Sequence, residues 1–158
     1  MKRLVSVELF EEHPAVNYYV IRFWDEDESL FDQFLIRFDT DEFETDLQSI
    51  THWLDVIGNR GALERYFKPE GHPRVKAIPV PPPNSVLRLY CFRISDQVLI
   101  LGGGKDKRVR KFQDDPELQM HVTIVKTVGK KLLRFIELRK ASVDGKILKG
   151  KLTFEIEI

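Results

Sequence analysis

Hydrophobic positions in the first third of the chain follow two different periods, and each period predicts a type of element. Segments 4–10 and 15–24 are rich in β-branched and aromatic residues, which indicates two strands paired as a hairpin. Apolar residues then recur at helical spacing over 31–38 and again over 43–57, which predicts two amphipathic helices. Gly58 is the expected C-terminal cap of the second helix.

The middle of the chain changes to a strand-like pattern. Segment 74–80 alternates apolar and polar residues, and the stiff "PPPN" at 81–84 cannot belong to a central sheet ladder. Segments 85–94 and 97–103 are apolar runs separated by a very short turn, which predicts an antiparallel hairpin. Three strands are therefore expected after the second helix.

The last third predicts one long helix and a terminal strand. Asp115 and Pro116 form a typical helix start, so a helix is expected from about 116 into the 130s, with Gly129 as a candidate interruption. "SVDG" indicates a turn, and the alternating "KLTFEIEI" at the end of the chain indicates a final strand.

Together these elements predict an α+β fold, with a small antiparallel or mixed sheet and the helices packed on one face. The length of 158 residues, with 42% hydrophobic and 32% charged residues, fits a single domain over 1–158. No apolar run approaches the roughly 20 residues that span a bilayer, and the first residues lack the apolar centre of a signal peptide. We therefore expect a cytoplasmic protein without a membrane partner.

Several familiar chemistries find no support in the residues. The single cysteine, Cys91, excludes a disulfide within the chain, and none of the four histidines stands at metal-ligand spacing from another. "GGGKDK" differs from a phosphate-binding P-loop, because Asp106 occupies the position of the hydroxyl residue and would repel phosphate. The three glycines are instead expected to form a bulge or turn with positive φ. No metal and no cofactor are expected.

Charge is distributed unevenly although the formal net charge is zero. Residues 1–66 carry 15 acidic and 6 basic side chains, whereas residues 67–158 carry 10 acidic and 19 basic ones. Such a distribution is typical of a protein with a basic face that binds a polyanion. The structural alternative is a solvated surface whose two halves attract each other.

The spacing of the cations matches the predicted strands. Basic or polar residues two apart project from the same side of a strand, and three such pairs occur on consecutive strands: Arg74 and Lys76, Arg88 and Tyr90, and Lys105 and Lys107. A cationic surface of this kind can bind RNA phosphates and stabilise the charge that builds on phosphorus during cleavage by the ribose 2′-hydroxyl, without metal. Each member taken singly is also compatible with a solvated lysine that protects a strand edge.

The order strand, two helices, basic strand, "LRLYCFRISDQVLILGGGKDKR" and helix resembles the RelE/HigB-type toxins of bacterial toxin–antitoxin systems, including phage-derived relatives. The resemblance covers about 16–135 and leaves about 136–158 as a C-terminal extension of helix and strand. It implies a metal-independent endoribonuclease that cuts messenger RNA, often on the ribosome. It also implies a cognate antitoxin that covers the basic surface.

The resemblance places the transition-state arginine at Arg88, and further basic residues at the end of the next strand and on the preceding one. The expected catalytic residues are Arg88, Lys105, Lys107, Arg108 and Tyr90, and the expected RNA-binding residues are Arg74, Lys76, Arg93, Arg110 and Lys111. Relatives carry a tyrosine or histidine shortly after the basic cluster, whereas this chain has Phe112, which exchanges no proton. Tyr90, His72 or His121 would have to replace it.

Two alternatives remain open beside the ribonuclease. One is a catalytically silent module of the same fold that keeps affinity for RNA or protein, which Phe112 and the C-terminal extension favour. The other is an interaction protein whose acidic N-terminal helices pair with the basic half of a second copy. That protein would form a salt-sensitive oligomer and have no affinity for RNA.

Overall fold

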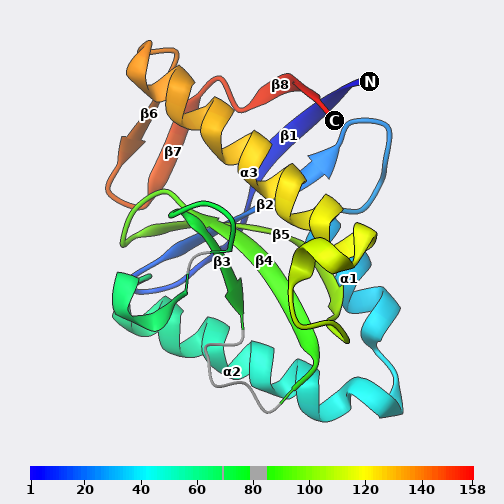
Figure 1. The fold of residues 1–158 in the computed structure, drawn as a ribbon. Helices are drawn as coiled ribbons and strands as arrows, with labels where there is room; N and C mark the ends of the chain where they lie inside the picture. The colour runs from blue at the N-terminus through cyan, green and yellow to red at the C-terminus, as the bar shows by residue number, and fades with distance from the viewer. Residues whose placement is uncertain (69, 79–84) are drawn as a thin grey trace.

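The computed structural model describes residues 1–68, 70–78 and 85–158, which form an α+β fold built on one mixed sheet (Figure 1). The strands are β1 (Lys2–Glu12), β2 (Asn17–Phe23), β3 (Val75–Ile78), β4 (Leu87–Arg93), β5 (Val98–Asp106), β6 (Ala141–Asp144), β7 (Ile147–Gly150) and β8 (Thr153–Glu157). The helices are α1 (Leu30–Phe38), α2 (Glu44–Arg60) and α3 (Pro116–Glu137), with short 3₁₀ turns at Asp41–Phe43, Glu64–Tyr66 and Phe112–Asp114.

Six strands pair in the order β3-β4-β5-β2-β1-β8, and β6 and β7 form a separate hairpin. The predicted N-terminal hairpin is confirmed, since β1 and β2 are antiparallel. The chain returns to the sheet through α1 and α2, and β5 then lies parallel to β2, which makes the sheet mixed. The predicted strand 74–80 is present as β3, while positions 79–84, including "PPPN", lie outside the described residues.

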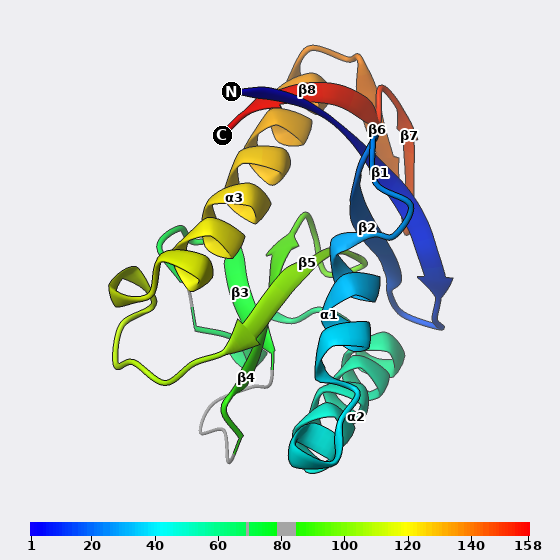
Figure 2. The same ribbon diagram turned by 90° about the vertical axis from the view of Figure 1, so that its right-hand side faces the viewer.

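The prediction that the helices share one face of the sheet is wrong. Figure 2 shows α3 on one side of the sheet and α2 on the other. On β5, Val98 and Ile100 belong to the core under α3, whereas Leu99 and Leu101 belong to the core under α1 and α2. A continuous apolar run is typical of a strand buried on both faces, so a second layer of helices is required to cover it.

The predicted start of α3 is confirmed. The Asp115 side chain accepts hydrogen bonds from the backbone amides of Glu117 and Leu118, and Pro116 begins the helix. Gly129 does not interrupt α3, which is continuous from Pro116 to Glu137. A methyl group at position 129 would overlap the buried ring of Phe92. The glycine therefore allows α3 to lie close against β4.

The predicted cap of α2 is displaced by one turn. The helix runs past Gly58 to Arg60 and ends at Gly61, whose φ of 111° is a left-handed conformation suited to glycine. Gly58 lies inside the helix against the ring of His13.

The C-terminal residues form more strand than the sequence predicted. "SVDG" does contain a turn, at Gly145, but the residues on both sides of it pair as β6 and β7. The final strand β8 pairs with β1 and buries Phe154 and Ile156, as the alternation indicated. Among the described residues, the helices are all too short or too polar to cross a bilayer.

Candidate functional site

Arg88 and Lys105 are direct partners across the antiparallel pair β4 and β5. Val98 and Ile100 of β5 face α3, so strict alternation would turn Lys105 toward α2. A β-bulge reverses the side on which Lys105 lies. The step from Leu89 to Cys91 on β4 is two residues, whereas the paired step from Gly104 to Leu101 on β5 is three. The bulge therefore places both cations on the side of the sheet that faces α3.

The bulge consists of the predicted glycines, although they do not have positive φ. A side chain at Gly102 would overlap Val125 of α3, and one at Gly104 would overlap the backbone carbonyl of Arg88. The glycine run is required for close approach of helix and strand, and not for a left-handed turn as the sequence suggested.

Lys76 does not share this surface, so the predicted single face of three cationic pairs is wrong. Lys76 pairs with Cys91, whose side chain lies in the core under α2, and it is only 1% exposed. Its Nζ donates to Glu64 Oε2 at 2.9 Å, and this hydrogen bond lowers the pKa of Glu64. Arg74 precedes β3 and donates to the carbonyls of Arg93 and Ile94.

Two further predicted cations are paired within the protein. Arg93 contacts Glu64, Asp96 and the carbonyl oxygen of Ala62. Arg108 pairs with Asp106 at 2.9 Å and with Glu42 at 3.4 Å. By contrast, no carboxylate of the described residues forms an ion pair with the remaining candidates Lys107, Arg110 and Lys111.

Lys105 is neutralised by the cap of α3. Its Nζ lies 2.9 Å from Asp115 Oδ2, and both side chains are largely buried. The hydrogen bond raises the pKa of Lys105 and lowers that of Asp115. Both groups are therefore charged at neutral pH, and they neutralise each other.

Arg88 is the half-buried cation of this surface. Its Nη1 donates to the carbonyl oxygens of Ser85 at 2.7 Å and of Leu87 at 2.9 Å. No carboxylate in the described part of the chain forms an ion pair with it, and burial lowers its pKa. A guanidinium held by carbonyls keeps donors that a phosphate can accept.

Tyr90 lies in the core beneath α3 and is 0% exposed. Its hydroxyl has no hydrogen-bond partner among the described residues, and burial raises its pKa. Phe112 is also buried and lies against Gly71, so the segment before β3 and the start of α3 meet above the sheet. Solvent and substrate do not reach Tyr90 in this conformation.

The two candidate histidines lie at different places on α3's side of the sheet. The ring of His72 stacks on Phe92, and burial together with Lys130, Lys126 and Arg74 lowers its pKa. His121 is more deeply placed against Gly103, and burial is the main cause of its lowered pKa. Both rings are therefore neutral at pH 7 and can accept a proton.

Glu70 is a carboxylate that the sequence analysis did not single out. It is half-buried, and desolvation raises its pKa, against the opposing charges of Lys107, Arg88 and Lys68. A half-buried carboxyl among cations is a typical general base or acid. Glu70 belongs to the irregular segment "KPEGHP", which shows no periodicity in the sequence. Its interaction with the charge of Arg88 follows only from the fold.

No group of three or more potential ligands is arranged to hold a metal ion within 1–68, 70–78 and 85–158. The chain matches no protein-family model, no curated protein and no solved structure. The class that the structure defines is an α+β protein with a mixed sheet and helices on both faces.

Proposed function

We propose that the protein is a metal-independent endoribonuclease of the toxin–antitoxin type, acting on messenger RNA. The observation that carries the proposal is the cross-strand pair of Arg88 and Lys105, together with the half-buried Glu70, whose charge interacts with that of Arg88 without an ion pair between them. The element order of the resemblance, from β2 through α1, α2, β3, β4 and β5 to α3, is also present.

Glu70 and Arg88 can divide the work of backbone cleavage. In the proposed reaction, Glu70 accepts the proton of a ribose 2′-hydroxyl, whose oxygen attacks the adjacent phosphorus. The bond to the 5′-oxygen breaks, that oxygen takes up a proton from water, and a 2′,3′-cyclic phosphate remains. The Arg88 guanidinium stabilises the negative charge that builds on the phosphoryl oxygens.

The raised pKa of Glu70 suits this role, because a general base acts best when its pKa approaches the working pH. Glu70 also provides a residue that can exchange a proton, which Phe112, at the position after the basic cluster, cannot do. Tyr90 is a weaker candidate than the sequence indicated, because its hydroxyl is fully covered.

A second function, a catalytically silent RNA-binding module, is favoured by one specific contact. Lys105 is neutralised by Asp115, so one of the two expected catalytic cations has no free charge to offer. A module of this kind would bind RNA through Lys107, Arg110 and Lys111, which form no ion pair with any residue that the structure describes, and leave the RNA backbone intact.

Expression in a bacterium separates the two functions. The wild type, an Arg88→Ala/Lys105→Ala variant and a matched Lys2→Ala/Arg60→Ala control would be induced while growth and messenger RNA integrity are followed. The ribonuclease predicts arrested growth and cut transcripts for the wild type and the control, and relief by the site variant. Normal growth with intact transcripts for all three would overturn the ribonuclease and leave the silent module.

A further inference from the structure

We propose that the groove between the C-terminal end of α3 and the β6–β7 hairpin is a second RNA-binding site, which holds the phosphate backbone. This site lies outside every residue that the sequence analysis assigned, and it deepens the proposed function by adding a substrate-holding surface. The groove has a volume of about 420 Å³, and three cations line it: Arg139, Lys140 and Lys149. Ser142 adds a hydroxyl.

The cations of the groove are largely free of internal partners. Within the described ranges, Lys149 has one distant carboxylate neighbour, Asp144 at 3.9 Å, and Arg139 and Lys140 have none. All three are exposed. The sequence-predicted cations Lys76 and Lys105, by contrast, are held by Glu64 and Asp115. Charge that the fold does not neutralise is available to an anionic ligand.

Arg139 occupies a backbone position that favours glycine. Its φ is 59°, and it is the residue at which the chain leaves α3, with the Lys140 amide donating to the carbonyl of Phe135. Glycine or asparagine normally fills this left-handed position, because a β-carbon there costs about 1 kcal/mol. Arg139 adopts this conformation as part of the helix cap, and its side chain lines the groove.

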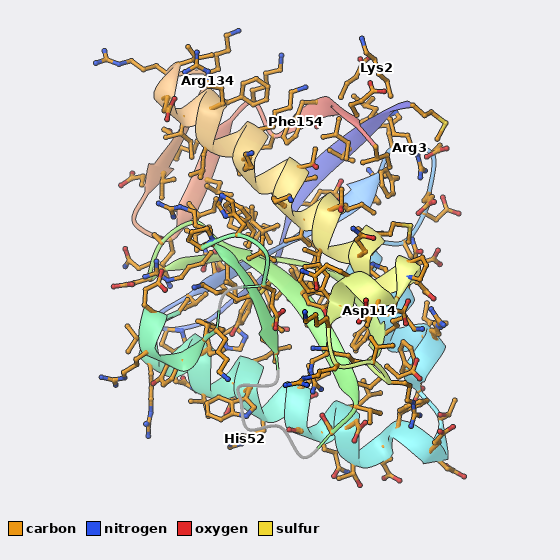
Figure 3. The ribbon with its side chains drawn as sticks, viewed as in Figure 1. Lys2, Arg3, His52, Asp114, Arg134 and Phe154 are labelled. Atoms are coloured by element: carbon orange, nitrogen blue, oxygen red, sulfur yellow. The ribbon has the colours of Figure 1, made fainter. Side chains whose placement is uncertain are left out.

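A row of cations on α3 extends the groove toward the candidate active site. Lys126, Lys130 and Arg134 are four residues apart, which places them along one side of the helix. Lys126 and Lys130 lie close enough to His72 to lower its pKa, and Arg134 points away from the molecule at the far end of α3 (Figure 3). Arg134 is paired with Glu137 at 2.9 Å, whereas Lys126 and Lys130 form no ion pair among the described residues, so these two lysines repel each other and would favour an anionic ligand.

RNA fits this surface better than the other polyanions. The cations form an extended track along α3 into the groove, and a nucleic-acid strand presents a matching row of single negative charges. A helix that binds an anionic membrane has a large exposed apolar face beside its cations. The exposed side of α3 instead carries the cations Lys130 and Arg134. The cations on α3 also reach His72, one of the candidate proton-transfer residues.

The test measures binding without cleavage. The probe is a short fluorescent single-stranded RNA with 2′-O-methyl groups, which lacks the nucleophile and is not cut by a ribonuclease of the proposed kind. The groove variant is Arg139→Gly/Lys140→Gln/Lys149→Gln, because glycine suits the left-handed position and preserves the fold. The control variant Lys2→Gln/Arg60→Gln/Arg65→Gln removes the same number of exposed cations elsewhere.

Fluorescence anisotropy should give an affinity about tenfold weaker for the groove variant at moderate salt, and a log–log salt slope lower by about 2. The control should change the affinity less than about threefold, and both variants should melt within a few degrees of the wild type. Equal losses in both variants, no loss in either, absence of RNA binding, or binding to anionic vesicles in preference to RNA would each overturn the groove site.

The outcome is independent of the proposed cleavage. A groove variant that still cuts ordinary RNA and binds the probe like the wild type would overturn the groove and leave the ribonuclease. A wild type that binds through the groove and cuts no RNA would support the groove and overturn the ribonuclease.

Discussion

Asp115 joins Lys105 of β5 to the first turn of α3. Its Oδ2 accepts from Lys105 Nζ at 2.9 Å, while its Oδ1 accepts from the amides of Glu117 at 2.9 Å and Leu118 at 3.2 Å. One carboxylate thus caps the helix and neutralises the cation that lies opposite Arg88. This contact controls how much positive charge the candidate site presents.

Asp115→Asn separates these two roles, because asparagine caps a helix as well as aspartate but carries no charge. We expect the variant to bind single-stranded RNA more tightly, since Lys105 keeps only Glu117 at 4.0 Å as an ion-pair partner among the described residues, and to melt somewhat earlier because a largely buried cation loses its partner. Anisotropy titration against the wild type checks this. An Asp115→Ala variant should lose the cap and melt earlier. Unchanged or weaker binding by Asp115→Asn would show that Lys105 does not contact RNA.

Glu70→Gln should change the pH dependence of stability. Burial raises the pKa of Glu70 above its ordinary value of 4.5, so the folded protein holds this proton more tightly than the unfolded chain. The contribution of the group to stability therefore falls as the pH rises from 4.5 through the raised value. We expect the variant to melt above the wild type at pH 7 and to lose this advantage below pH 4.5. Thermal unfolding across this range checks the sign.

Lys76→Met tests whether this buried lysine has a structural role. Lys76 is covered on the α2 side of the sheet, and its partner Glu64 is 60% exposed and keeps Arg93 as a second partner. Methionine fills the buried position without a charge, and the exposed Glu64 stays solvated, so no buried charge is left unpaired and we expect a change of about 1 kcal/mol or less in the free energy of unfolding. RNA affinity should stay at the wild-type value, whereas Lys107→Met should weaken it. A loss of affinity in Lys76→Met would restore this residue to the RNA-binding set.

Gly129→Ala should destabilise the protein although alanine is the better helix former. The added methyl group overlaps the ring of Phe92, which is fully buried and has no room to move. Overpacking of this kind costs about 1–3 kcal/mol, against a gain of about 1 kcal/mol in helix propensity. Chemical denaturation should show a lower free energy of unfolding, and Gln119→Ala on the exposed side of α3 is the control. A stabilised Gly129→Ala would show that α3 does not lie tightly against β4.

Local patterns were sufficient to predict most elements. The helical spacing of Phe31, Phe34 and Phe38 marks the buried side of α1, and the Asp115-Pro116 pair marks the start of α3. These signals depend on residues close together in the chain, so they can be recognised without knowledge of the tertiary structure.

The facing of the cations depends on contacts between distant segments. Lys76 and Arg88 lie on neighbouring strands but on opposite faces, because the register pairs Lys76 with Cys91. The bulge in β5 reverses the side on which Lys105 lies, and no pattern in the glycine run specifies where the extra residue falls. A one-residue shift in a strand moves every later side chain to the other face.

The carboxylates of the site were missed for the same reason. Glu64 and Glu70 lie in the connection between α2 and β3, which shows no periodicity, and their partners come from β3 and β4. The basic groove at β6 and β7 was also missed, because the sequence indicated only a turn there. Its cations gather in space through the hairpin and the end of α3.

The most direct test of the proposed reaction is cleavage of a defined messenger RNA by the purified protein in the presence of a chelator. We predict cuts that leave 2′,3′-cyclic phosphate ends for the wild type, a loss of at least about a hundredfold in rate for Arg88→Gln and for Glu70→Gln, and no loss for an Arg60→Gln control. Intact RNA with the wild type, or equal cleavage by the Arg88→Gln variant, would contradict the account.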